Sequence, residues 1–322
     1  MCAAAQNTRL KLPTICKSQQ TGSFFKRSIQ PDSMAATLFF RCPTEFIMMT
    51  YTAQDQINRK AWRSGGARRL FGALTGFTDP GEAGALASVA DEVRGEALLD
   101  VGVGGGRTVP LLRQLSDNYT AVDYTAELVD VCKRNYPDVR VLHADARDLS
   151  MFDDESFALV MFSWNGIDAV DPVGRQAILH EFTRVLRPGG LLLFSTHNML
   201  GPGYRENLLN MLNWPNDARN ALDFGLKTAR VIARLPSGAF NFVRHSRLNR
   251  QYDGFGLRVC AAHRFGIVIY YTELEAQKRA LADYGLHTEH VFGNLSEHEL
   301  NAGDDLRRVF WFHFVARKPR TT

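Results

Sequence analysis

The chain has 322 residues, 45% of them hydrophobic and 22% charged, which is ordinary for a soluble globular protein with one large core. No uninterrupted apolar run approaches the roughly 20 residues that cross a bilayer, so we expect no membrane partner, and a net charge of +4 does not by itself indicate nucleic-acid binding. The five cysteines form no C-x-x-C pair and no His, Cys and acid cluster has zinc spacing, so we expect reduced thiols, a cytoplasmic protein and no metal.

Residues 1–48 differ in composition from the rest of the chain. They are basic and rich in Ser, Thr and Gln, contain only two acids, and show no sustained periodicity. This composition predicts a disordered tail or an extension upstream of an internal start at Met34, Met48 or Met49, and a transit peptide is the alternative. Residues 49–322 are then expected to form a single domain.

The segment before the first strand of that domain is expected to be helical. Residues 51–77 mix aromatic and basic side chains and predict one or two short helices. Thr78 or Asp79 can cap a helix that runs to about Val93, with Pro80 in its first turn.

A glycine-rich stretch follows a short apolar strand, residues 97–101. The strand carries Asp100, and glycines recur at alternate positions before a predicted helix over residues 109–115. Glycine permits a tight turn and lets a ligand lie against the main chain, beside the unpaired N–H groups of the helix start. A carboxylate two residues before the first glycine would repel a pyrophosphate, so we expect a ligand with an ammonium group. A glycine-rich turn without a ligand, or an ordinary nucleotide site, is the alternative.

An acid followed by alternating glycines resembles the first motif of the class I S-adenosylmethionine-dependent methyltransferases. The resemblance implies a Rossmann-like α/β fold with a mostly parallel seven-stranded sheet and an antiparallel last strand. In this family a leading helical segment often closes over the cofactor, which implies a contact from Tyr51 or Arg63. The resemblance also implies S-adenosylmethionine as the cofactor, bound in this stretch by Asp100, Gly102, Gly104, Gly106 and Arg107.

A second acid, Asp123, ends the next predicted strand, residues 119–123. It lies about 20 residues past the glycines, where nucleotide-binding folds place a carboxylate that accepts hydrogen bonds from both ribose hydroxyls. Its neighbour Tyr124 is predicted to contact the cofactor as well. The alternative is that Asp123 caps the helix predicted for residues 125–135.

The third predicted strand, residues 139–143, also leads into an acid. In the resembled family an acid at this place receives the adenine amino group, and the next backbone N–H meets a ring nitrogen. Asp145 and Ala146 match those two positions. An aspartate in an ordinary loop is the alternative.

The fourth predicted strand, residues 157–162, ends in a polar loop. In open α/β sheets ligands bind beyond the carboxyl ends of the strands, so this loop should face the transferred group. We expect Ser163 and Trp164 to contact the cofactor, and Asn165 and Asp168 to contact the substrate. A turn made by Asn165 and Gly166 is the alternative.

The next units complete the expected sheet. A helix over residues 173–186 is stopped by Arg187-Pro188-Gly189-Gly190, and a strand over residues 191–196 follows. This run, from Arg184 onward, also resembles a class I methyltransferase signature. The last two strands are predicted at residues 287–292 and 310–316, the final one antiparallel.

Residues 199–268 interrupt the sheet as a basic insert that is expected to cap the substrate site. A helix is predicted over residues 216–234, strand material that can form a hairpin over 255–271, and a further helix from 272 to about 284. The arginines are densest over residues 244–250. They indicate an acidic substrate or nucleic acid, and a solvated surface is the alternative.

The sequence therefore predicts an enzyme that transfers a methyl group from S-adenosylmethionine to an O or N atom of a small molecule. Such transfer depends mainly on alignment. The candidates for proton handling are Asp168, His197, His263 and Tyr271. One alternative is a methyltransferase for RNA or protein that docks through the insert. Another is a relative that binds the nucleoside without catalysis. The acceptor and the oligomeric state are not specified by the sequence.

Overall fold

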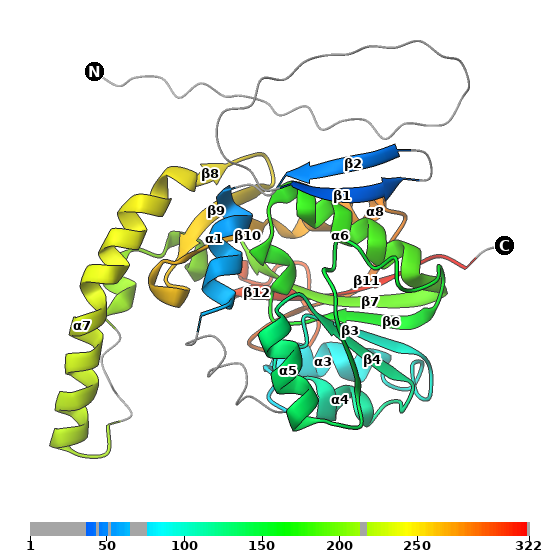
Figure 1. The fold of residues 1–322 in the computed structure, drawn as a ribbon, viewed down its shortest axis with the longest axis horizontal. Helices are drawn as coiled ribbons and strands as arrows, with labels where there is room; N and C mark the ends of the chain where they lie inside the picture. The colour runs from blue at the N-terminus through cyan, green and yellow to red at the C-terminus, as the bar shows by residue number, and fades with distance from the viewer. Residues whose placement is uncertain (1–36, 43–44, 51–52, 65–75, 213–217, 321–322) are drawn as a thin grey trace, which may run out of the picture.

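The computed structural model describes residues 53–64, 76–212 and 218–320, together with the backbone of residues 37–42 and 45–50. A twisted sheet lies at its centre, with helices on both faces (Figure 1). From the glycine-rich stretch to β7 the chain alternates strand and helix, except that β6 follows β5 without a helix between them. The predicted Rossmann-like α/β architecture is confirmed.

Seven strands form the main sheet in the order β5-β4-β3-β6-β7-β12-β11. The first five pair in parallel, while β12 runs antiparallel to both of its neighbours, as predicted. Their bounds in chain order are β3 Leu98–Val101, β4 Tyr119–Asp123, β5 Arg140–His143, β6 Phe157–Phe162, β7 Leu186–Asn198, β11 His287–Gly293 and β12 Trp311–Arg317.

Both faces of the central strands are buried, which explains why a strand such as β6 is continuously apolar. Successive residues of a strand point to opposite faces. Leu99 of β3 packs in the cluster that includes Phe182 of α6, whereas its neighbour Leu98 packs in the other cluster with Leu112 of α4. The helices that cover the two faces are α3 Pro80–Val89, α4 Val109–Arg113, α5 Ala126–Asn135, α6 Pro172–Val185 and α8 Leu274–Asp283.

Two of these helices begin with the same local device. Asp79 caps α3 by accepting from the backbone N of Glu82 at 2.9 Å, and Asp171 caps α6 by accepting from Gly174 N at 2.7 Å. In each case a proline is the first helical residue, where its missing N–H costs no hydrogen bond. The predicted cap at Asp79 is confirmed, and α3 ends four residues before Val93.

The insert adds three strands to the carboxyl end of β7. Strands β9 and β10 form the expected antiparallel hairpin, and β10 pairs in parallel with His197 and Asn198. Short turns of 3-10 helix connect the elements. The bounds are η1 Gly166–Ala169, η2 Pro202–Arg205, η3 Leu208–Met211, α7 Ala221–His245, η4 Ser246–Leu248, β8 Arg250–Gln251, β9 Phe255–Cys260, η5 Ala262–Arg264, β10 Ile267–Thr272 and η6 Leu306–Arg308.

The predicted helix over residues 216–234 was too short. Helix α7 starts at Ala221 and continues through Pro236 to His245, extending away from the body of the molecule (Figure 1). A proline removes one helical hydrogen bond, but packing beyond it can hold the helix together. That packing is present, because the Phe242 ring meets the Phe265 ring edge-on with centroids 5.0 Å apart.

A two-stranded hairpin overlaps the end of the segment, residues 1–48, for which the sequence predicts disorder. Strand β1 (Thr37–Cys42) pairs antiparallel with β2 (Glu45–Thr50). Both strands are rich in aromatic and β-branched residues, which favour extended backbone. The prediction for residues 1–36 lies outside the described residues, so the boundary at residue 48 remains a prediction.

Candidate functional site

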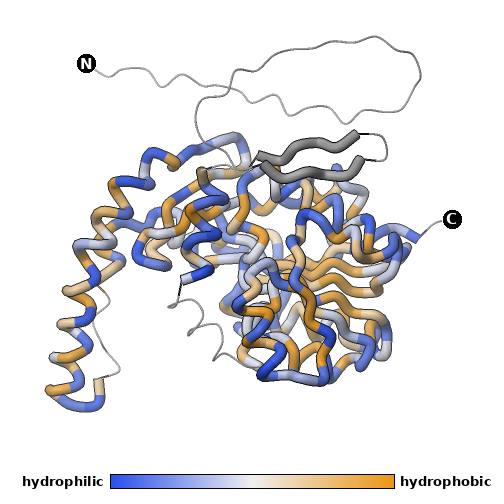
Figure 2. Tube along the Cα trace, in the orientation of Figure 1, coloured by the Kyte–Doolittle hydropathy of each residue, from blue (hydrophilic) through white to orange (hydrophobic). Residues whose placement is uncertain are grey.

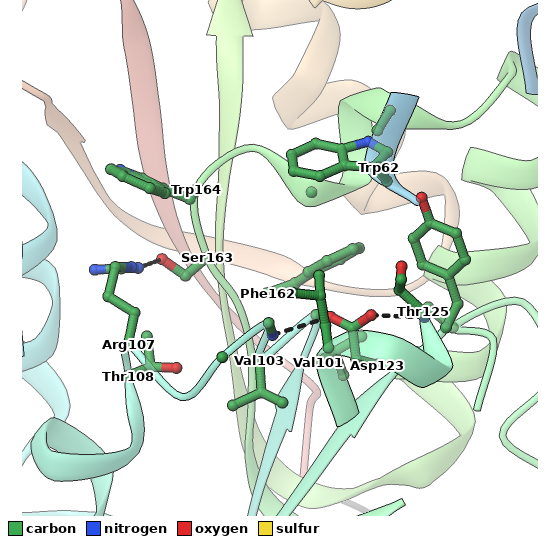
Figure 3. A pocket seen from close by; sticks show the side chains of 18 of the residues that line it. Trp62, Val101, Val103, Arg107, Thr108, Asp123, Thr125, Phe162, Ser163 and Trp164 are labelled. Atoms are coloured by element: carbon green, nitrogen blue, oxygen red, sulfur yellow. Dashed lines mark hydrogen bonds between the residues drawn. The ribbon is translucent and has the colours of Figure 1, made fainter. Parts of the chain in front are cut away.

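An open pocket of about 810 Å³ lies beyond the carboxyl ends of β3, β4 and β6, which is where the fold is expected to bind a ligand. Figure 3 shows Asp123 on one side of the pocket and Trp62 and Trp164 on the other. Eight of the predicted cofactor residues line it: Gly102, Gly104, Arg107, Asp123, Tyr124, Ala146, Ser163 and Trp164.

The turn after β3 needs its glycines for two different reasons. Gly102 and Gly106 have φ angles of +69° and +103°, which other residues resist. A Cβ on Gly102 would also come within 2.6 Å of Phe162, and one on Gly106 within 2.3 Å of Tyr136. Gly106 is therefore a packing residue beside α5, and it is absent from the pocket lining.

The Asp123 carboxylate is held by two backbone N–H groups. Its Oδ2 accepts from Gly104 N at 2.9 Å and its Oδ1 from Thr125 N at 2.7 Å (Figure 3). Burial raises the pKa of Asp123, while these two donors oppose that rise. Each oxygen retains a second acceptor position. The residue that caps α5 is Thr125, so the alternative of Asp123 as the helix cap is not observed.

Asp100 lies beneath the glycine turn and does not line the pocket. Its Oδ2 accepts from Thr108 Oγ at 2.5 Å and from Tyr119 Oη at 2.6 Å, which ties the start of α4 to β4. Burial raises the pKa of Asp100 to about 6, against the opposing hydrogen bonds from Thr108 and Tyr119. The structure therefore gives Asp100 a supporting position, and the predicted contact with a ligand ammonium group is withdrawn.

Arg107 forms one wall of the pocket through a buried ion pair that the sequence did not reveal. Its guanidinium bonds both oxygens of Glu82, at 2.7 and 2.8 Å, and it also contacts Ser163 Oγ. Its charged group lies 5.0 Å from the centre of the Trp164 ring. Glu82 is fully buried in the first turn of α3. The pair fixes Arg107, Ser163 and Trp164 relative to one another.

Asp145 lies beside the main pocket, in a smaller adjoining cavity of about 360 Å³. Its carboxylate is bonded by Arg59 and by Arg147, whose Nη2 is 2.7 Å from Oδ2. Ala146 lines both cavities. An adenine amino group at Asp145 would therefore have to share the carboxylate oxygens with the guanidinium groups of Arg59 and Arg147, which already donate to them.

Helix α1 (Ala53–Trp62) brings Arg59 and Trp62 to the two cavities. Buried amides anchor it, because Asn58 donates to the carbonyls of Ala169 and Val268, each at 2.7 Å, and accepts from Val268 N at 2.8 Å. The sequence predicted a helical segment closing over the ligand without distinguishing Trp62 from the neighbouring aromatic residues. Two residues were predicted to make that contact. Tyr51 lies outside the described residues, and the side chain of Arg63 is mainly exposed, with its Nε 3.8 Å from Glu127 Oε1.

Three of the four candidates for proton handling lie together. Asp168 Oδ2 accepts from the backbone N of His197 at 2.7 Å and lies 2.8 Å from His197 Nδ1. The His197 ring packs against Tyr271, with centroids 5.1 Å apart. His263 is separate and packs edge-on against Trp62 at 5.2 Å. None of these four residues lines either described cavity.

The loop after β6 makes the turn that the sequence offered as an alternative. Asn165 has a φ of +57°, and its backbone N donates to Ser195 Oγ at 2.7 Å. A Cβ on Gly166 would come within 2.1 Å of Phe162. Asn165 is buried outside both described cavities, so its substrate contact remains a prediction.

The arginines of the insert do not form one site facing the pocket. Arg244, Arg247 and Arg250 lie on α7, η4 and β8 in turn, and Arg250 donates to the carbonyl of Arg247 at 2.7 Å. No residue of 218–268 lines the two cavities that the structure describes. The predicted role of the insert as a substrate cap remains a prediction.

Comparison with known proteins finds similarity over part of the chain. Residues 98–190 match the family described as a methyltransferase domain. The chain is 31% identical over 125 residues to a demethylmenaquinone methyltransferase of Renibacterium salmoninarum, covering 37% of this chain and 51% of that protein. It is 30% identical over 169 residues to a probable S-adenosylmethionine-dependent methyltransferase of Mycolicibacterium smegmatis, covering 52% of this chain and 63% of that protein. The chain thus spans between about half and two thirds of the length of these two relatives.

A solved structure shares the fold over a longer part of the chain. It is the 1,6-didemethyltoxoflavin-N1-methyltransferase of Burkholderia thailandensis, with bound 1,6-didemethyltoxoflavin and S-adenosylhomocysteine. The TM-score is 0.50 at 12% identity, over 89% of this chain and 97% of that one. At this identity the likeness concerns the fold alone.

Proposed function

We propose that this chain, whose residues 98–190 form a methyltransferase domain of the class I S-adenosylmethionine-dependent family, methylates an O or N atom of a small molecule. The observation that carries the proposal is the Asp123 carboxylate, held at the pocket edge by Gly104 N and Thr125 N. A carboxylate with a free acceptor position on each oxygen suits a pair of adjacent hydroxyls, such as those of a ribose.

The residues present fit S-adenosylmethionine, which supplies an electrophilic methyl group when it is bound. Asp123 would hold the ribose. Gly102 and Gly104 let the ligand lie against the main chain, and the aromatic rings of Trp62 and Trp164 exclude water from the opposite side. This assignment of residues is part of the proposal.

The pair of Asp168 and His197 is proposed to accept the proton that the acceptor loses. Asp168 accepts a hydrogen bond from the Nδ1–H of His197, which leaves Nε2 as the nitrogen that receives a proton. Arg175 Nη1 and Thr196 Oγ hold the other carboxylate oxygen, at 2.5 and 2.7 Å, which fixes the direction of the carboxylate. His197 lies at the carboxyl end of β7, on the same edge of the sheet as the pocket.

A small molecule is the proposed acceptor because aromatic rings, among them Trp62 and Trp164, form part of the cavity walls and the insert's arginines lie outside them. One of the relatives to which the chain is similar in sequence bears the name of a small acceptor, demethylmenaquinone. The second candidate is an RNA or protein substrate docked on the basic insert. The third is a chain that binds the nucleoside without catalysis.

The three candidates are separated by transfer of a labelled methyl group. The full chain is incubated with labelled S-adenosylmethionine and, in parallel, with pools of small alcohols, phenols and amines, with total RNA and with proteins. We expect label in a small-molecule pool. Label in RNA, together with an RNA affinity that falls steeply as salt rises, would contradict the proposal in favour of the second candidate. Cofactor binding without any labelled product would favour the third.

A further inference from the structure

Helix α7 carries an apolar side that no described part of the protein covers. Three of its large apolar side chains are mostly exposed, with fractions of 74% for Leu222, 64% for Phe240 and 74% for Val243. Residues three, four or seven apart share one side of a helix. The set that shares this side, here named the α7 stripe, is Leu222, Leu226, Ala229, Ala233, Phe240 and Val243, all of them exposed.

The side of α7 that packs on the protein is a different one. Gly238 is buried, and a Cβ there would come within 2.1 Å of Met211 on η3. His245 Nδ1 lies 3.0 Å from the carbonyl of Phe265, and the Phe242 ring packs against the same residue. The fold therefore uses one side of α7 to attach it and leaves the α7 stripe outward. Figure 2 shows apolar residues continuing along the projecting part of the helix.

The charge around the α7 stripe is strongly positive. Residues 218–250 contain seven basic residues and one acid, Asp223, whose carboxylate already lies 3.1 Å from Lys227 Nζ. The six arginines of this stretch are exposed: Arg219, Arg230, Arg234, Arg244, Arg247 and Arg250. Three of them, Arg230, Arg234 and Arg244, lie on α7 beside the stripe. A helix whose apolar side is bordered by arginines is typical of segments that lie in the interface of an anionic bilayer.

We propose that α7 lies on the surface of an anionic lipid bilayer, with the α7 stripe buried at the headgroup boundary and the arginines near the lipid phosphates. The helix is about 37 Å long, and a flat surface can meet it along its length without requiring a matching groove. No described helix is long and apolar enough to cross a membrane, but a helix that lies on a surface does not need to cross it. The expectation of no membrane partner rested on the absence of a span, and it is revised to that extent.

A second copy of the chain fits the same surface less well. Pairing two α7 helices would bring together two stretches of the same positive charge. The centre of the α7 stripe also consists of the small residues Ala229 and Ala233, next to Pro236, and these fill a helix–helix seam poorly. An RNA partner would use the arginines but would leave the apolar side chains in water.

The test is co-sedimentation of the full chain with vesicles of phosphatidylcholine, with and without phosphatidylglycerol. We expect binding to the anionic vesicles and little binding to the neutral ones. The triple variant Leu222→Gln, Leu226→Gln, Phe240→Gln should lose affinity for the anionic vesicles by about ten-fold or more. The three changes remove most of the apolar area that the α7 stripe would bury in the bilayer. A matched triple variant, Met151→Gln, Val173→Gln, Leu295→Gln, removes three exposed apolar side chains elsewhere and should bind like the wild type.

Circular dichroism of each variant confirms that α7 still folds. The proposal is overturned if the wild type stays in the supernatant with anionic vesicles, or if the α7 triple variant binds them as well as the wild type. It is also overturned if light scattering shows that the wild type and the matched triple variant are dimers while the α7 triple variant is a monomer, since the stripe would then join two copies. None of these measurements needs a methyl acceptor, so their outcome is separate from that of the proposed function.

Discussion

At the scale of single residues, Asp100 shows how a motif residue can support a site without touching its ligand. The carboxylate is buried under the glycine turn and joins Thr108, at the start of α4, to Tyr119 of β4. Its place in the sequence predicted a ligand contact, because spacing along the chain cannot tell which way a side chain turns at the end of a strand. The direction follows from the packing of Tyr119, which is encoded some twenty residues later.

Replacing Asp100 with Asn should change the pH dependence of stability. Because the folded-state pKa is about 6, the folded chain keeps a proton that the unfolded chain loses near pH 4, so wild-type stability falls as the pH rises through this window. The amide of Asp100→Asn does not titrate and can still accept from Thr108 and Tyr119. Relative to the wild type, its free energy of unfolding should rise by about 2 kcal/mol between pH 4 and pH 7. Urea denaturation of both proteins at the two pH values measures this change. If the difference in free energy of unfolding between the variant and the wild type were the same at both pH values, the raised pKa of Asp100 would be contradicted.

His197 is the residue at which the proposed chemistry can be tested directly. With the acceptor that the labelled-methyl screen identifies, His197→Gln should lower kcat by about a hundred-fold or more, because a positioned base is lost. The affinity for S-adenosylhomocysteine should stay unchanged, since His197 does not line the pocket. His180→Gln, on the exposed side of α6, is the matched control and should retain full kcat. An unchanged kcat in His197→Gln would remove the residue from the mechanism.

At the scale of elements, the start of α3 also holds the last strand in place. Besides capping α3, Asp79 accepts from Trp311 Nε1 at 2.9 Å and lies 2.9 Å from His313 Nε2, both on β12. The cap could be predicted from the sequence because it depends on neighbouring residues. The link to β12 could not, because it joins residues more than 230 positions apart.

Asp79→Ala should therefore cost more than an ordinary helix cap. Losing the cap costs about 1 kcal/mol, and leaving the ring nitrogens of half-buried Trp311 and buried His313 without this partner adds about 1 to 3 kcal/mol. Asp171→Ala, which removes the corresponding cap of α6, is the control and should cost about 1 kcal/mol. Urea denaturation of both variants gives the comparison. Equal losses of stability would show that the contacts with β12 contribute nothing.

At the scale of the whole molecule, the parallel sheet and the place of the pocket were predictable because strands such as β3 and β4 lead into local signals. Asp123 and the glycines are such signals, and the structure brings them to one pocket. Trp62 was not predictable as part of the site, since its position depends on the long-range anchoring of α1 by Asn58. The length of α7 was also missed, because contacts with η5 stabilise the helix beyond Pro236.

The measurement that tests the central claim most directly is calorimetric titration of the full chain with S-adenosylhomocysteine. We expect the wild type to bind. Asp123→Ala should lose affinity by about ten-fold or more, because a charge-assisted hydrogen bond to the ribose is lost. Asp130→Ala makes the same exchange at an exposed position of α5 and should bind like the wild type. Failure of the wild type to bind, or equal affinity in Asp123→Ala, would contradict the assignment of this pocket to S-adenosylmethionine.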